Sequence, residues 1–246
     1  MQGLQYSVAH PLTGRQGVMR NEDKDSLLNI IFDLDDTLHD KSASLKSYAD
    51  ELLNTTLNNL DGAEQLFVSE FIAQNNIIQP KTQVFSVLAE RFNFSPKLER
   101  ELLLAFDRSF HEFSVPFDGA KEALVMLKNS DVSIGCITNG RDFFQKRKIT
   151  ALGFDEYFDF TITSGGVGVK KPDLSIFKMG LSKFSDSGKK VCFCGDSLSS
   201  DMAPAKNLGL VTLWKTEKFH KPEYVDHSFS TFQEFDQLWR TTLAYA

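Results

Sequence analysis

The segment Asp33-Leu34-Asp35-Asp36-Thr37 directly follows an apolar run from Leu28 to Phe32, and this junction constrains the chain more than any other feature. An apolar run of this length that ends in clustered carboxylates predicts a buried strand with its charges at the tip. Asp33 and Asp35 have the same parity, so in an extended chain both lean to one side. Two carboxylates held this close repel unless a cation lies between them or one is protonated. Mg²⁺ is the usual hard ion for such oxygen ligands. The alternative is a solvated acidic loop after a strand.

Strands and helices alternate along most of the remaining chain. Apolar runs predict strands at 28–34, 132–137, 160–163, 191–194 and 210–213. Helical spacing of apolar residues predicts helices at 119–127, 142–152 and 173–184, and a further helix at 203–208 that Gly209 closes. This alternation, with short connections, favours a parallel sheet covered on both faces. We therefore expect an α/β fold with a doubly wound, Rossmann-like parallel sheet.

A helical insertion of roughly 75 residues is expected directly after the first strand. Residues 40–113 are predicted to be helical almost throughout, with breaks at Gly62 and Pro80. The predicted organisation is a core of residues 28–38 and 115–246, with residues 39–114 inserted as a separate helical unit. Residues 1–27 are predicted to be a loose leader, and Met19 is an alternative start of the chain.

Charge and composition exclude several classes of function. The chain has 246 residues and a net charge of −6, which argues against a partner that is a nucleic acid polymer. No stretch approaches the ~18 apolar residues of a membrane span, and residues 1–27 do not resemble a secretory signal. Cys136, Cys192 and Cys194 lie in apolar runs without a disulfide pattern, which favours a reducing, cytoplasmic location. The sequence leaves the oligomeric state open.

Three further polar motifs follow predicted strands. They are Thr138-Asn139-Gly140, Lys170-Lys171-Pro172, and Gly195-Asp196-Ser197 with Asp201 five residues after Asp196. Because parallel strands end at one edge of the sheet, this edge would collect carboxylates, a hydroxyl, a lysine and backbone amides. Such an inventory suits phosphoryl transfer, which needs positioning and neutralisation of phosphate oxygens.

With these four motifs in this order, the sequence resembles the haloacid dehalogenase-like hydrolases over about residues 28 to 215. The resemblance implies that Asp33 is the nucleophile and Asp35 the general acid and base. It implies that Thr138, the amide of Asn139 and Lys171 bind phosphate. Mg²⁺ would be the cofactor, with Asp33, the carbonyl of Asp35, and Asp196 as ligands, and Asp201 as a ligand or a neighbour of one.

The resemblance also implies a reaction and a substrate class. Dehalogenases of the family lack the second aspartate of the first motif, so Asp35 indicates a phosphatase. The helical insertion matches the family's cap of the first type. The expected substrate is a small phosphorylated metabolite, with a nucleoside monophosphate or flavin mononucleotide as the best guess. Between Leu38 and Val115 there are 7 Lys or Arg and 11 Asp or Glu, a net charge of −4, which predicts little attraction for polyanions.

Other interpretations stay open at this point. Within the family they are a phosphomutase and a sugar-phosphate or phosphoglycolate-type phosphatase. Outside this class they are a receiver-like signalling module with a phosphorylatable aspartate and a catalytically silent binding protein.

The sequence also predicts the positions of several single residues. His39 is expected to be a hinge residue without a chemical task rather than a residue of the pocket mouth. His220, His227 and Lys170 are expected at the surface. Asp36, with parity opposite to its neighbours, is expected to face solvent or a nearby amide.

Overall fold

The computed structural model describes residues 28–57, 60–130, 132–185, 189–218 and 220–243. The predicted leader and the alternative start at Met19 lie outside the described residues. In the part of the chain that is described, every helix is too short or too polar to span a lipid bilayer.

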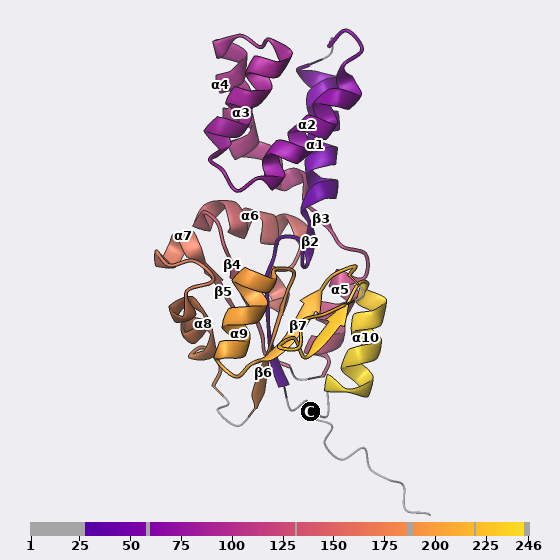
Figure 1. Cartoon of the computed structure of the whole chain (residues 1–246), viewed down its shortest axis with the longest axis vertical. Helices are drawn as coiled ribbons and strands as arrows, with labels where there is room; N and C mark the ends of the chain where they lie inside the picture. Colours follow the sequence, from indigo (N-terminus) through magenta and orange to yellow (C-terminus); the bar gives the residue numbers. More distant parts are fainter. Residues whose placement is uncertain (1–27, 58–59, 131, 186–188, 219, 244–246) are drawn as a thin grey trace, which may run out of the picture.

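A six-stranded parallel sheet forms the centre of the molecule (Figure 1). Its strand order is β5-β4-β1-β6-β7-β8. The bounds are β1 (Leu28–Phe32), β4 (Ile134–Thr138), β5 (Phe160–Thr163), β6 (Lys190–Gly195), β7 (Val211–Lys215) and β8 (His227–Phe229). All five residues of β1 are buried, as expected for a central strand with helices on both faces. The predicted doubly wound α/β fold is confirmed.

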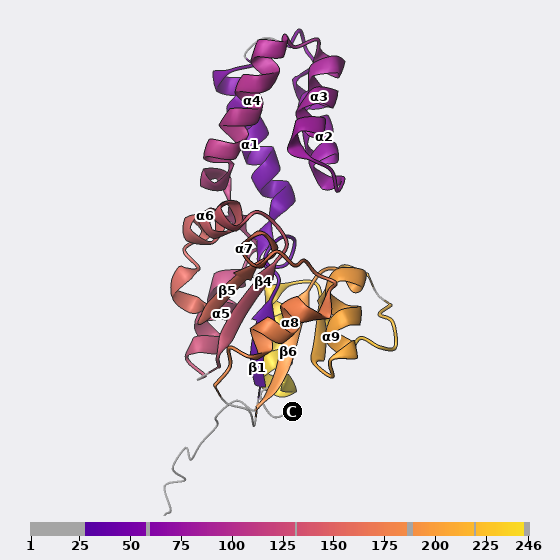
Figure 2. The same cartoon turned by 90° about the vertical axis from the view of Figure 1, so that its left-hand side faces the viewer.

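Helices cover both faces of this sheet (Figure 2). They are α5 (Ala120–Lys128), α6 (Asp142–Leu152), α7 (Ser164–Val167), α8 (Leu174–Leu181), α9 (Ala203–Asn207) and α10 (Phe232–Thr241), with the short turns η2 (Asp155–Tyr157) and η3 (Leu198–Met202). Successive β1 side chains alternate between two apolar clusters. Ile30 and Phe32 pack with α5 and α10, whereas Ile31 packs with α8 and α9.

The insertion forms a helical bundle above the carboxyl edge of the sheet (Figures 1 and 2). It contains α1 (Lys41–Thr55), α2 (Glu64–Asn76), α3 (Lys81–Phe92), α4 (Pro96–Ser109) and the turn η1 (Phe110–Phe113). The bundle has its own aromatic core around Tyr48, Phe71 and Phe106. Two short antiparallel strands, β2 (His39–Asp40) and β3 (Val115–Pro116), connect the bundle to the sheet.

Several elements differ from the sequence-based expectation. The strands β2, β3 and β8 are only 2, 2 and 3 residues long, too short for a recognisable alternation. The glycine-containing segment at 164–167, for which no helix was predicted, forms the short helix α7 with the Thr163 hydroxyl as its N-cap. Helix α10 was not predicted, although Phe232, Phe235 and Trp239 recur at helical spacing behind a Thr231 cap.

Candidate active site

Asp33 lies at the tip of the central strand. Its backbone N–H donates to the carbonyl of Cys194 at 2.8 Å, which continues the β1–β6 pairing by one residue. Asp33 is buried, at 8% exposure of the whole residue. Strands β4 and β6 flank β1 in register, with Phe32 opposite both Cys136 and Cys194. This register brings the ends of three strands, and the motifs that follow them, to one place.

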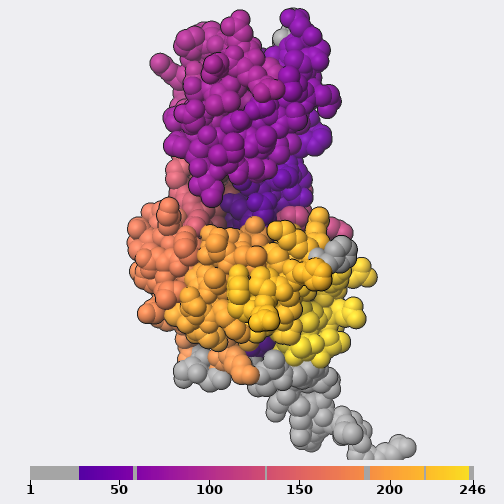
Figure 3. Space-filling model, viewed as in Figure 1, coloured from indigo at the N-terminus to yellow at the C-terminus, as the bar shows by residue number. Residues whose placement is uncertain are grey.

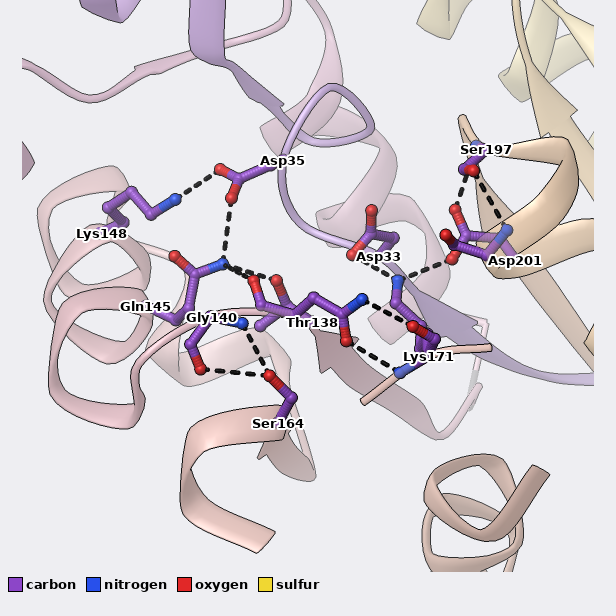
Figure 4. Close-up of polar contacts among 12 residues, drawn as sticks. Asp33, Asp35, Thr138, Gly140, Gln145, Lys148, Ser164, Lys171, Ser197 and Asp201 are labelled. Atoms are coloured by element: carbon purple, nitrogen blue, oxygen red, sulfur yellow. Dashed lines mark hydrogen bonds and ion pairs between the residues drawn. The ribbon is translucent and has the colours of Figure 1, made fainter. Parts of the chain in front are cut away.

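Lys171 connects two carboxylates of this site. Its Nζ atom lies 2.7 Å from Oδ1 of Asp33 and 2.7 Å from Oδ1 of Asp201 (Figure 4). Burial alone would lower the pKa of Lys171, but Asp201 and Asp33 outweigh burial and raise it, so the side chain is an ammonium ion. The neighbouring Lys170 is exposed, as expected.

The side chain of Asn139 holds the Lys171 backbone in place. Its Oδ1 accepts from the Lys171 N–H at 2.9 Å, and its Nδ2 donates to the Lys171 carbonyl at 3.0 Å. This paired contact joins the loop after β4 to the loop after β5. From the sequence, only the backbone amide of Asn139 was expected to take part in the site. The contact shows that its side chain also positions Lys171.

Three carboxylates gather beside Lys171. Asp33, Asp196 and Asp201 each offer an oxygen, and these oxygens lie within 4.8 Å of one another. Burial, together with Asp201 and Asp196, raises the pKa of Asp33 to about 8 although Lys171 opposes the shift. Burial and the neighbouring Asp201 and Asp36 raise the pKa of Asp196 to about 7. A crowded set of hard oxygen donors, whose charged forms repel one another, fits Mg²⁺.

Asp35 faces a different set of partners from Asp33 (Figure 4). Its Oδ1 lies 2.5 Å from Nζ of Lys148 and 2.6 Å from Nδ1 of His39. Its Oδ2 accepts from Nε2 of Gln145 at 3.0 Å. Burial would raise the pKa of Asp35, but Lys148 and His39 hold it well below its usual range. Asp35 is therefore a carboxylate in this arrangement.

His39 lies in β2, at the connection to the bundle where a hinge was expected, and its ring makes contacts that the sequence did not predict. The ring is fully buried, and besides its contact to Asp35 its Nε2 lies 2.8 Å from the hydroxyl of Ser44. The Ser44 hydroxyl in turn donates to the carbonyl of Asp40 at 2.7 Å. His39 thus links Asp35 to the first turn of α1, where the chain enters the bundle.

Thr138 and Gln145 form a second polar contact of the site. The hydroxyl of Thr138, at the end of β4, accepts from Nε2 of Gln145 at 2.6 Å. Because the same amide also contacts Asp35, Gln145 joins the first and second motifs. Neither Gln145 nor Lys148 was predicted, since helical spacing within α6 does not tell which face meets the sheet edge.

A cleft of about 330 Å³ lies between the bundle and this edge of the sheet. Figure 3 shows the recess that separates the two parts. Apolar side chains of Leu45, Phe106, Phe110 and Phe144 form one part of its lining. Asp35 and four cations form another, and two of these cations, Lys41 and Lys81, come from the bundle. The net charge of −4 between Leu38 and Val115 therefore does not describe the part of the bundle that lines the cleft, which is basic.

Asp36 has a left-handed backbone, with φ of 59°, and its carbonyl accepts from Nζ of Lys215 at 3.3 Å. Its side chain is only half-buried. Asp36 thus turns the chain between Asp35 and the bundle.

The fold and the site together define an α/β enzyme whose carboxylates and lysine meet at the tips of parallel strands. The profile of the haloacid dehalogenase-like hydrolases matches residues 30–215, and the chain belongs to this family. The resemblance stated from the sequence is confirmed, and so is the enzyme class, a hydrolase of phosphoric monoesters. This match sets aside the receiver-like module and the silent binding protein.

Several curated relatives align with much of the chain. A glyceraldehyde 3-phosphate phosphatase of Methanocaldococcus jannaschii is 28% identical over 218 residues, which cover 83% of this chain and 93% of the relative. The pyrimidine 5'-nucleotidase YjjG of Escherichia coli is 32% identical over 158 residues, covering 63% of this chain and 68% of the relative. Among solved structures, the magnesium-bound HAD-hydrolase YfnB of Bacillus subtilis has the same fold, with a TM-score of 0.66, 19% identity, and coverage of 86% and 98%.

Proposed function

We propose that this protein is a Mg²⁺-dependent phosphatase of small phosphorylated metabolites that works through a phosphorylated Asp33. The observation that carries this proposal is the position of Lys171, with Nζ 2.7 Å from both Asp33 and Asp201 at the strand tip. A nucleophilic carboxylate must meet a dianionic phosphate, and a buried ammonium ion beside it offsets that repulsion.

In the first half of the reaction, a carboxylate oxygen of Asp33 attacks the phosphorus atom and the bond to the leaving oxygen breaks. Thr138 and the backbone N–H of Asn139 are proposed to donate to the phosphoryl oxygens, and Lys171 to neutralise their charge. Asp35 donates a proton to the leaving oxygen. Asp35 can carry this proton only if its pKa rises, because Lys148 holds that pKa low. The negative charge of an entering phosphate raises the pKa of Asp35.

In the second half, water attacks the phosphorus atom of phosphorylated Asp33. Asp35 takes the proton of this water, and phosphate departs as the Asp33 carboxylate re-forms. The lowered pKa of Asp35 favours its carboxylate form, which is the form that accepts this proton.

Asp33, Asp196 and Asp201 are the side chains that would hold Mg²⁺, with the carbonyl of Asp35 as a further proposed ligand. The bound ion supplies positive charge that screens these carboxylates from the phosphate. The helical bundle is proposed to act as the cap that encloses the cleft and excludes water during transfer.

The dimensions and lining of the cleft support the proposed substrate class. Its size and its aromatic lining suit a small phosphorylated metabolite. The nucleoside monophosphate or flavin mononucleotide predicted from the sequence, whose leaving groups are neutral, stays an alternative that the stacking surfaces of Phe106, Phe110 and Phe144 would support.

The test is phosphate release from p-nitrophenyl phosphate by the purified chain with Mg²⁺. We expect Asp33→Asn to abolish release and Asp36→Asn to retain most of it. The Asp36 change is a matched control, because it removes the same charge three residues from Asp33, and asparagine tolerates a left-handed backbone. Full activity of Asp33→Asn, or a trapped phosphoryl group on another residue, would refute the assignment of the nucleophile.

A further inference from the structure

The cleft between the bundle and the sheet is strongly basic. Among the described residues that line it, five are ionisable: Asp35 and the cations Lys41, Lys81, Arg141 and Lys148. Two of these cations have carboxylate partners. Lys148 pairs with Asp35, and Arg141 pairs with Asp107 through contacts of 2.5 and 3.0 Å.

Lys41 and Lys81 have no ion pair among the described residues. Lys41 begins α1 and lies near Asp36, where it opposes the rise in the pKa of that carboxyl that burial and Asp35 cause. Lys81 begins α3, and its Nζ donates to the neutral Oδ1 of Asn75 at 2.5 Å. The two lysines thus bring positive charge into the cleft that the protein itself does not neutralise with an ion pair.

The surroundings of Lys81 make this charge costly. The ammonium lies 5.3 Å from the centre of the Phe106 ring and is partly buried. Burial, together with Lys41 and Lys148, lowers the pKa of Lys81 to about 8, although Asp35 opposes the shift. An anion in the cleft would relieve this repulsion.

The N-terminus of α3 adds to the positive electrostatic potential of the cleft. Pro80 is the N-cap of this 12-residue helix, and no side chain caps its first turn. A helix N-terminus carries partial positive charge and exposed N–H groups, which favour an anion beside it. The uncapped helix end and the unpaired Lys81 therefore favour the same kind of ligand.

From these contacts we infer that the leaving group of the substrate carries a second anionic group, a carboxylate or a second phosphate, which binds between Lys41 and Lys81. This inference rests on the proposed function, since the phosphate to be transferred occupies the Asp33 end of the cleft. The apolar side chains of Leu45, Phe110 and Phe144 line the space for the carbon atoms that join the two anionic groups.

Matched pairs of substrates test this inference. Phosphoglycolate is compared with ethyl phosphate, which lacks the carboxylate, and propanediol bisphosphate with propyl phosphate, which lacks the second phosphate. The full chain with Mg²⁺ is expected to show kcat/KM at least ~10-fold higher for the member of one pair that carries the second anionic group, the gain of one charge-assisted contact. The pair that shows the gain tells whether the second group is a carboxylate or a phosphate.

Variants identify the residues that bind the second anionic group. Lys81→Met and Lys41→Met are each expected to reduce this ratio toward one, mainly through KM, whereas Lys81→Arg retains it. Lys97→Met is the matched control, because Lys97 is a lysine of the same bundle that is 85% exposed. A ratio near one for both pairs in the unmodified protein, or a ratio unchanged in both methionine variants, would overturn the inference.

A binding measurement separates this inference from the proposed function. Calorimetry with the Asp33→Asn variant and Mg²⁺ compares the Kd of phosphoglycolate with that of ethyl phosphate, and likewise for the second pair, without turnover. Preferential binding of the member with the second anionic group supports the anion site, even where the unmodified protein releases no phosphate. The absence of phosphate release would refute only the proposed function. Equal affinities within both pairs would overturn the anion site alone.

Discussion

The ammonium group of Lys148 lies 2.5 Å from carboxylate oxygen Oδ1 of Asp35, although 113 residues separate them in the chain. Lys148 is buried at 3% exposure on α6, and Asp35 follows β1. The contact therefore fixes the orientation of Asp35 from outside its own motif.

Replacing Lys148 by methionine removes this contact while keeping most of the side-chain volume. General acid–base help is worth roughly 10² to 10⁴ in rate, so partial loss of Asp35 orientation is expected to lower kcat by ~10-fold. The measurement is steady-state phosphate release from p-nitrophenyl phosphate. A kcat equal to that of the unmodified protein would show that Lys148 does not position Asp35.

The matched control is Lys146→Met. Lys146 lies on the same helix and pairs with Asp142 at 2.9 Å, but both side chains are exposed. Exposed pairs contribute little, so kcat and Tm are expected to stay near their original values. Measuring Tm for both variants separates a loss of orientation from a loss of folded protein.

The sequence predicted the positions of the four motifs because three of them directly follow an apolar run and the fourth, with Lys171, follows the segment after another such run. A parallel sheet brings such chain segments to one edge whatever the intervening helices do, so the proximity of Asp33 to Lys171 and Asp201 follows from the topology. The contacts of Asp35 with His39 and Lys148 do not follow from it. They depend on how the insertion and α6 are oriented on the sheet, which apolar spacing leaves undetermined.

The charge of the cleft was missed for a related reason. A net charge averages over all faces of the bundle, whereas the described part of the bundle lines the cleft only with the start of α1, the start of α3 with Gln79 before it, and the end of α4 with η1. Lys41 and Lys81 stand at helix starts, where a basic residue opposes the helix dipole. Such an unfavourable placement in the sequence is the one feature that could have drawn attention to these two lysines.

Mg²⁺ is expected to raise the Tm of the protein. The cluster of Asp33, Asp196 and Asp201 places three carboxylates within reach of one ion, and only the folded chain assembles them. A ligand that binds only the folded state at 100 times its Kd stabilises by about 2.7 kcal/mol. Differential scanning calorimetry with EDTA and with excess Mg²⁺ measures the shift, which Asp196→Asn should reduce. Identical Tm values in EDTA and Mg²⁺ would argue against a metal site in this cluster, as would phosphate release that persists in EDTA.

Gly195→Ala is expected to damage the same cluster through packing. A Cβ atom at residue 195 would lie 2.6 Å from Oδ2 and 2.7 Å from Cγ of Asp201. Asp201 is fully buried and also accepts from the Ser197 N–H at 3.1 Å, so it has little room to move. We expect a loss of roughly 1–3 kcal/mol in the free energy of unfolding, measured by urea denaturation.

A double-mutant cycle separates this clash from a general effect of alanine. In Gly195→Ala combined with Asp201→Ala, the obstructing carboxylate is absent, so the two losses should not add. Strictly additive losses would mean that the Asp201 carboxylate is not what requires glycine at this position.

Preference for a second anionic group is expected to depend on pH through Lys81. Because its pKa is lowered to about 8, Lys81 is charged below this pH and loses its charge as the pH rises through it. The groups that act on it are Lys41 of α1, Lys148 of α6, Arg141 directly before α6, and Asp35. Since kcat/KM reports the free enzyme, the phosphoglycolate to ethyl phosphate ratio should fall between about pH 7 and pH 9. Ionisation of the phosphate ester and of the catalytic groups affects both substrates and cancels in this ratio.

Lys81→Arg should keep the ratio constant over the same range, because arginine does not titrate there. A ratio that is independent of pH in the unmodified protein would exclude Lys81 as the group that binds the second anion.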